Sequence, residues 1–83
     1  MIEKELVVNI KTGLHARPTA QLVKGLSQYS STVILEVKEK KYNAKSIMGV
    51  MSAAIYEGTQ VRVIIDGADE EETLEWISHF FSS

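Results

Sequence analysis

The segment that says most about the fold is Gly13-Leu14-His15-Ala16-Arg17-Pro18. Proline has no amide hydrogen, so it is tolerated in the first turn of a helix but rarely deeper inside one. Glycine lets the backbone turn without a Cβ clash. The segment therefore predicts that a strand ends before Gly13 and that a helix begins around His15 or Ala16.

The start of this helix has the properties of an anion site. Its first amide N–H groups, including that of Ala16, have no acceptor within the helix and lie at the positive end of the helix dipole. Arg17 adds a guanidinium that can bind phosphate or carboxylate oxygens through paired hydrogen bonds. His15 would then be suited to carry a phosphoryl group, because the neutral imidazole is an available nucleophile at cellular pH. The alternative is a surface or capping histidine followed by a solvated arginine.

On both sides of this segment, periodicity and turn residues predict seven elements in the order βαββαβα. Strands are expected at residues 3–10, 32–37, 40–43 and 60–66. Helices are expected at residues 16–28, at 46–55 and after Asp69. Such an order favours one antiparallel sheet with helices covering one face.

Several details of these elements can also be predicted. The core side of the first helix is expected to be formed by apolar residues, namely Ala20, Leu22, Val23 and Leu26, with Tyr29. Gly25 in mid-helix suggests that another group packs closely there. The turn at Lys38-Glu39 lacks glycine, so a primed hairpin turn is not favoured.

Two helix boundaries follow from capping residues. Gly58 is expected to help end the second helix. Asp69 and Glu72 have the spacing of a capping box at the start of the last helix. Later in that helix, Trp76 and Phe80 are four residues apart and are expected to pack rather than to bind a ligand.

Composition limits the classes of function. With 83 residues, 45% of them hydrophobic, the chain is expected to form one domain over residues 1–83. The net charge of −2 and the absence of a long basic run argue against direct nucleic-acid binding. The absence of cysteine excludes disulfides and thiolate metal sites, and His79 has no metal-ligand partner at useful spacing. No signal peptide or membrane-length apolar run is recognised, so we expect a cytoplasmic protein without membrane association.

A second motif is Lys45-Ser46-Ile47-Met48-Gly49-Val50-Met51-Ser52. Judged from the residues alone, Ser46 is the N-cap of a short helix. The two motifs, their separation and the chain length together resemble the histidine-containing phosphocarrier (HPr) family of the bacterial phosphoenolpyruvate:sugar phosphotransferase system. The resemblance covers essentially the whole chain.

This resemblance implies a fold and a reaction. The fold would be an open-faced β-sandwich, α+β in class, with strand order 1-4-2-3. The protein would be a phosphoryl carrier rather than a free-standing catalyst, and it would need no cofactor or metal. His15 would accept a phosphoryl group on Nδ1 from the phosphoenolpyruvate-dependent first enzyme and pass it to a sugar-specific enzyme IIA domain. Arg17 and the Ala16 amide would stabilise the phosphoryl group, and Pro18 would set the helix start.

The resemblance also implies regulation at the second motif. Ser46 would be phosphorylated by HPr kinase/phosphorylase, with Lys45 and the helix dipole favouring the added charge. Carbon catabolite repression would follow through catabolite control protein A. The side chains of Ile47, Met48 and Met51 would form a docking surface, although inward packing of the methionines is an alternative. A monomer is expected, with strand exchange about residues 11–13 as the other possibility.

Four residues depart from the family pattern, and we expect them to lie near the second helix and away from the His15 motif: Glu39, Ala53, Ala54 and Tyr56. Two further interpretations therefore stay open. One is an HPr-like signalling protein that acts through phospho-Ser46 and a transcription regulator, although members of that branch generally lack the histidine. The other is a small module that binds an anion at His15 and Arg17 without turnover.

Overall fold

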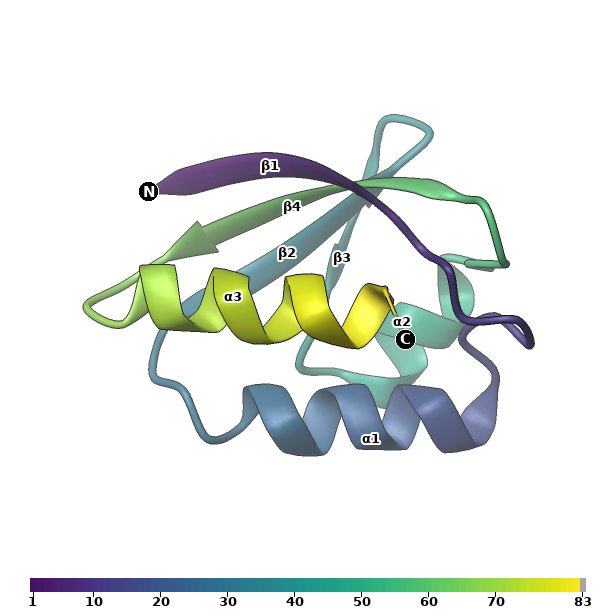
Figure 1. The fold of residues 1–83 in the computed structure, drawn as a ribbon, viewed down its shortest axis with the longest axis horizontal. Coiled ribbons are helices and arrows are strands. Elements are labelled where there is room, and N and C mark those ends of the chain that lie inside the picture. The colour runs from purple at the N-terminus through teal and green to yellow at the C-terminus, as the bar shows by residue number, and fades with distance from the viewer. Residues whose placement is uncertain (83) are drawn as a thin grey trace.

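The structure is a computed structural model that describes residues 1–82. Seven elements follow one another in the predicted order βαββαβα (Figure 1). They are β1 (Ile2–Val7), α1 (Ala16–Leu26), β2 (Thr32–Val37), β3 (Lys40–Asn43), α2 (Ile47–Ser52), β4 (Gln60–Asp66) and α3 (Glu70–Phe81). Within residues 1–82, no helix has the length and apolar character that a membrane span requires.

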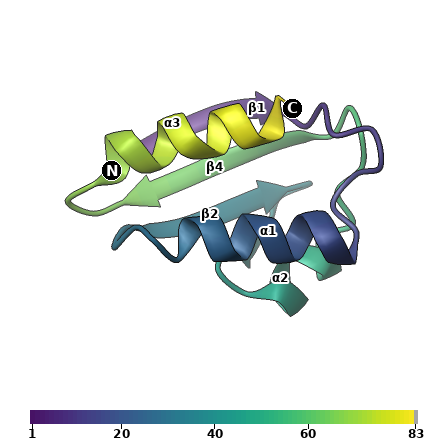
Figure 2. The same cartoon turned by 60° about the horizontal axis from the view of Figure 1, so that its bottom comes forward.

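The four strands form one antiparallel sheet in the order β1-β4-β2-β3, which confirms the expected topology. The register places Ile2 opposite Ile65 at one edge and Val37 opposite Lys40 in the β2–β3 hairpin. The helices cover one face of this sheet, with α1 and α3 running side by side in opposite directions (Figures 1 and 2). The bounds of β2, β3 and β4 agree with those predicted from the sequence.

Burial alternates along the strands, as expected for a sheet with one covered face. In β4 the side chains of Val61, Val63 and Ile65 are fully buried, while that of Arg62 is exposed. The fully or almost fully buried apolar residues form a single core cluster: Val8, Leu14, Leu22, Leu26, Val33, Leu35, Val37, Ala44, Val50, Ala53, Ile55, Val61, Val63, Ile65, Ile77 and Phe81. Burial of this set against the helices is the main force that holds the layers together.

Close packing at Gly25 is confirmed. A Cβ atom at this position would overlap the indole ring of Trp76, which reaches across from α3. Glycine is retained in mid-helix at a cost of about 1 kcal/mol in helix propensity because the ring occupies the space of a side chain. Trp76 itself is partly buried and packs against the core, as expected.

The first strand and the first helix are both shorter than predicted. β1 ends at Val7 because the next residues leave the sheet, with the Asn9 N–H donating to the Phe81 carbonyl at 2.7 Å. α1 ends at Leu26 instead of residue 28. The predicted core side of α1 is also wrong at one position, since Ala20 is exposed and Thr19 is fully buried. Thr19 can be buried because its hydroxyl donates to the Leu14 carbonyl at 2.9 Å.

The hairpin turn also differs from expectation. Lys38 and Glu39 both have positive φ angles, 51° and 69°, which is the pattern of a type I′ turn. The prediction that a primed turn is not favoured is therefore wrong. The twist of the flanking β2 and β3 strands matches a primed turn, and this match outweighs the cost of placing two residues with a Cβ in the left-handed region.

Two helix boundaries are set by residues other than those predicted. α2 ends at Ser52, and Ala54 rather than Gly58 closes it, with a left-handed φ of 53°. Asp69 is the N-cap residue of α3, but its side chain makes no capping hydrogen bond and there is no capping box with Glu72. Its carboxylate instead accepts hydrogen bonds from the loop before β2, including the Ser30 N–H at 2.8 Å.

Candidate functional site

His15 occupies the N-cap position of α1, immediately before the first helical residue, and its side chain is exposed. The helix begins at Ala16, as predicted. The imidazole makes no capping hydrogen bond, so it is not used to close the helix. These features leave the ring available to a partner, whereas the backbone of His15 is held by the first helical hydrogen bond, from the Thr19 N–H at 2.9 Å.

The turn before His15 is fixed by a segment from elsewhere in the chain. Gly13 has a φ of 71°, and a Cβ there would lie 2.9 Å from the Ile55 carbonyl oxygen and 3.0 Å from the Tyr56 Cα. The next residue, Leu14, donates its N–H to the same Ile55 carbonyl at 2.9 Å. Glycine is therefore required both for its backbone angle and for the close approach of residues 55 and 56.

The first turn of α1 has amide groups free to bind an anion. The structure gives the N–H groups of Ala16 and Arg17 no acceptor among residues 1–82. Pro18 follows without an N–H of its own. The Arg17 side chain is exposed and forms no ion pair within the described chain. Unpaired amides, a helix dipole and a free guanidinium thus lie in consecutive residues next to His15.

A depression of about 220 Å³ lies beside His15. Its walls come from the turn before α1 and from the end of α2 with the loop that follows: Thr12, Leu14, His15, Met51, Ala54, Ile55 and Tyr56. Ala54 and Tyr56 were expected to lie away from the His15 motif, and this expectation is wrong. The chain path past Gly13 brings them to the histidine, which the spacing of the residues in sequence does not reveal.

Ser46 is the N-cap of α2, as its sequence context predicts. Its Oγ accepts a hydrogen bond from the Gly49 N–H at 3.0 Å, and the residue is half-buried. The neighbouring Lys45 does not turn to Ser46, because its Nζ donates to the Tyr29 carbonyl at 2.7 Å. Lys45 therefore ties the loop after α1 to the start of α2.

The apolar residues of α2 face outward. The exposed fraction is 46% for Ile47, 82% for Met48 and 45% for Met51. The alternative that the two methionines pack inward is therefore wrong. Since Met51 also lines the depression beside His15, an apolar surface extends from the histidine toward Ser46. Tyr56, 66% exposed, adds an aromatic side chain at its edge.

Other candidate chemistry is limited within the part of the chain that the structure describes. No group of three or more His, Asp or Glu side chains there could hold a metal ion. The second histidine, His79, is exposed in the last turn of α3 and far along the chain from the His15 depression. Sequence reasoning missed the approach of residues 54–56 to His15. The one signal for it was Gly13, whose lack of a side chain allows a second segment to come close.

The chain is similar to known proteins over its whole length. A family model described as "PTS HPr component phosphorylation site" matches residues 2–83. The phosphocarrier protein HPr of Xylella fastidiosa (strain 9a5c) is 48% identical over 83 residues, which cover all of this chain and 93% of that protein. The HPr-like protein Crh of Bacillus subtilis (strain 168) is 46% identical over 80 residues, covering 96% of this chain and 94% of that one.

Solved structures lead to the same result. The crystal structure of HPr-C-His from Thermoanaerobacter tengcongensis superposes with a TM-score of 0.94 at 42% identity, covering 100% of this chain and 93% of that chain. Both the sequence match and the structural match extend over nearly the whole length of each protein. The chain therefore belongs to the HPr family of phosphocarrier proteins.

Proposed function

We propose that this chain carries phosphoryl groups in the sugar phosphotransferase system, with His15 as the residue that is phosphorylated. The observation that carries the proposal is the exposed His15 ring at the N-cap of α1, next to the unpaired Ala16 and Arg17 amides. In the step, a neutral ring nitrogen of His15, Nδ1 in the family, attacks phosphorus. The P–N bond forms as the bond to the donor breaks, and the donor keeps the electron pair. The ring proton stays on the other nitrogen.

The neighbouring groups would act on the phosphoryl oxygens. The Ala16 N–H and the Arg17 guanidinium can donate hydrogen bonds to them, and the dipole of α1 favours their negative charge. Pro18 leaves the first turn without a competing donor and sets the start of the helix. The protein would be a carrier that turns over only with its partner enzymes, the phosphoenolpyruvate-dependent first enzyme and an enzyme IIA domain.

Docking would use the apolar surface made by Ile47, Met48 and Met51. These side chains are exposed on α2, and Met51 also lines the His15 depression, so a partner that covers them also reaches the histidine. Flexible methionines suit a surface that must fit more than one partner. Because such partners act on cytoplasmic metabolites, we place the carrier in the cytoplasm.

Labelling with radioactive phosphoenolpyruvate and the first enzyme tests the carrier role. The wild-type chain should acquire label that survives base and is lost in acid, as a phosphohistidine does. His15→Ala should abolish it. The matched control is His79→Ala, which removes the other histidine and should leave labelling unchanged. Label that persists in His15→Ala would rule out the assignment.

We further propose that Ser46 is the regulatory site, phosphorylated by HPr kinase/phosphorylase. Ser46 borders the docking surface, so a phosphate there would place about two negative charges beside apolar groups that a partner must bury. Ser46→Asp should therefore slow His15 labelling while leaving the melting temperature close to that of the wild type. Ser46→Ala should lose the cap without slowing transfer. Equal labelling rates in all three proteins would show that Ser46 acts only as a helix cap and contradict the regulatory role.

A second candidate is a signalling role like that of Crh, in which phospho-Ser46 binds a regulator such as catabolite control protein A. The observation in its favour is the 46% identity to a Crh protein, nearly as high as that to HPr. The exposed His15 with its anion-binding neighbours favours the carrier. Labelling at His15 by the first enzyme separates the two roles, because signalling through Ser46 does not need the histidine.

A further inference from the structure

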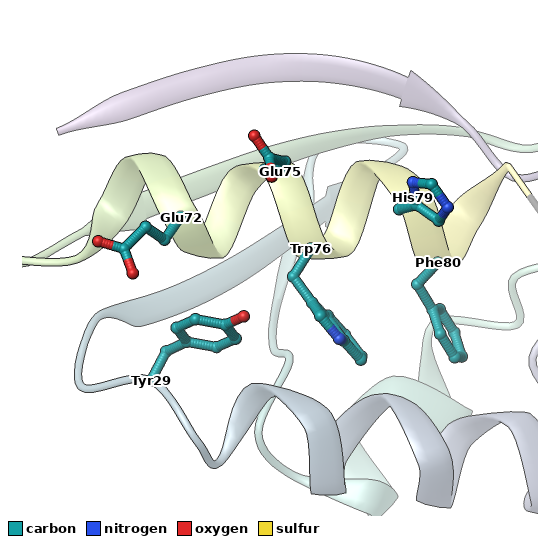
Figure 3. A pocket seen from close by; sticks show the side chains of 6 residues that line it. All are labelled: Tyr29, Glu72, Glu75, Trp76, His79 and Phe80. Carbon is teal, nitrogen blue, oxygen red and sulfur yellow. The ribbon is translucent and has the colours of Figure 1, made fainter.

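A second concave site lies along α3 and the loop after α1, apart from the His15 depression. It has a volume of about 510 Å³, within the range of small-molecule sites. Its lining residues are Tyr29, Glu72, Glu75, Trp76, His79 and Phe80 (Figure 3). No role described above for phosphoryl transfer or its regulation uses these side chains.

Aromatic rings form the inner wall of this pocket. Trp76 and Phe80 point from α3 toward α1, and Tyr29 reaches toward them from the loop after α1 (Figure 3). The rings of Trp76 and Phe80 are stacked, with centroids 5.2 Å apart and an angle of 16° between their planes. The exposed faces of these rings are electron-rich and attract cations, whereas the ring edges carry partial positive charge.

Contacts with neighbouring segments hold parts of this wall in place. The indole of Trp76 fills the space above Gly25, where any side chain would overlap it. The loop that carries Tyr29 is tied down by the hydrogen bond from Lys45 Nζ to the Tyr29 carbonyl. A ligand would therefore meet a packed indole ring and a loop whose backbone is already held, so less ordering entropy would be lost on binding.

Two carboxylates complete the pocket. Glu72 and Glu75 are exposed and line it together with His79, and no lysine or arginine is among its lining residues. Neither carboxylate forms an ion pair within residues 1–82. The charge that complements two free carboxylates and three rings is positive, and its carrier must be apolar enough to contact the rings.

We propose that this pocket binds a small organic cation whose charge is carried by a methylated ammonium group. Such a head group can contact Trp76 and Phe80 through its apolar surface while Glu72 and Glu75 balance its charge. A phosphate or carboxylate ligand is excluded by the same two carboxylates. A hard metal ion is disfavoured because the pocket offers it only two carboxylates, which supply fewer oxygen atoms than such an ion takes as ligands.

Binding here can be measured apart from phosphoryl transfer. The pocket shares no lining residue with the His15 depression. Tyr29 follows the end of α1 whereas His15 precedes its start, and a helix of 11 residues is about 16 Å long. Failure of this proposal would leave the carrier function untouched, and the reverse also holds.

Trp76 is the one tryptophan in the sequence, so its fluorescence reports directly on the pocket. The full chain is titrated with choline and, separately, with the uncharged isostere in which a carbon atom replaces the nitrogen. Sodium chloride serves as the control for ionic strength. We expect a saturable change in Trp76 emission with choline and at least about tenfold weaker binding of the isostere. No saturable change with choline, or equal binding of the isostere, would overturn the proposal.

Substitutions locate the effect. Glu72→Gln combined with Glu75→Gln keeps the shape of the side chains and should weaken choline binding about tenfold. Glu71→Gln is the matched control, since Glu71 is exposed on the same helix but does not line the pocket. Unchanged affinity in the double variant would overturn the proposal. Binding of an arginine-containing peptide without binding of choline would also overturn it and indicate a protein partner instead.

Discussion

At the scale of single residues, substitution of Arg17 can show whether this side chain acts in phosphoryl transfer or in stabilising the fold. Its guanidinium is exposed and has no ion-pair partner among the described residues, so Arg17→Ala should change the free energy of unfolding by less than about 0.5 kcal/mol. If Arg17 has the proposed role, the rate of His15 labelling should fall about tenfold or more, because a donor to the moving phosphoryl group is lost. Rates of labelling and denaturant melts of the same samples measure the two effects.

The control for Arg17 is Lys24→Ala, which removes an exposed cation from the last turn of the same helix. It should change neither quantity. If Arg17→Ala unfolded the domain while the folded fraction was labelled normally, the residue would be structural and the assignment wrong.

Asp69 illustrates a carboxylate whose partner lies far away in sequence. Hydrogen bonds lower the pKa of Asp69 from 3.8 to about 2. The Ser31 hydroxyl donates the bond with the largest effect, and the Ser30 N–H donates the bond with the next largest. Ser31 is fully buried, so its hydroxyl depends on this partner.

A lowered folded-state pKa means that the ionised form is the one that stabilises the fold. The contribution of Asp69 is therefore complete above its ordinary pKa of 3.8 and is lost as the pH falls from there toward 2. In Asp69→Asn the free energy of unfolding should be lower at neutral pH and should vary less over this acidic range. Urea melts at a series of pH values measure it. Glu71→Gln should keep the wild-type slope, and a wild-type slope in Asp69→Asn would contradict the linkage.

At the scale of secondary-structure elements, Gly25 sets how closely α1 and α3 approach. Helix propensity alone predicts that Gly25→Ala stabilises α1 by about 1 kcal/mol. The structure predicts the opposite, a loss of about 1–3 kcal/mol, because the new methyl group would overlap the Trp76 ring.

A double-mutant cycle tests this contact between helices. In a Trp76→Ala background the ring is absent, so Gly25→Ala should become neutral or stabilising. Thermal or denaturant unfolding of the four proteins gives the coupling. A destabilisation of equal size in both backgrounds would show that the cost at Gly25 arises elsewhere than at Trp76.

At the scale of the whole molecule, the arrangement of β1 bears on the oligomeric state. Relatives include the Crh structure from Bacillus subtilis described as a swapped dimer and a structure described as an HPr dimer from Thermoanaerobacter tengcongensis. In this chain β1 pairs along its full length with β4 of the same molecule, and the terminal amine of Met1 lies 3.2 Å from the Glu70 carboxylate. The segment after β1 is also fixed, with the Gly13 N–H bound to the Ile10 carbonyl at 2.9 Å.

We therefore expect a monomer, because exchange of β1 would break the turn at Gly13 and the hydrogen bonds of residues 8 and 9 before forming new ones. Sedimentation velocity from micromolar to millimolar concentration should show a single species of monomer mass. A dimer that dissociates only on heating would instead indicate strand exchange through residues 11–13.

Sequence alone predicts the element order, the bounds of three of the four strands and the start of α1 at Ala16. These features depend on local chemistry. Alternating β-branched residues suit a half-buried strand, proline has no amide to lose in a first helical turn, and the Ser46 hydroxyl caps the amide three residues on. The resemblance to the family rests on the two motifs, their separation and the chain length.

Contacts between segments that are far apart in the sequence could not be predicted, because they depend on how the whole chain folds. The side chain of Asp69, at the N-cap position of α3, binds Ser31 instead of capping the helix. The fold also brings Ala54 and Tyr56 to His15. In each case the deciding contact joins groups that local periodicity cannot relate, because a hydrogen bond or a packed ring depends on distance in space and not on spacing along the chain.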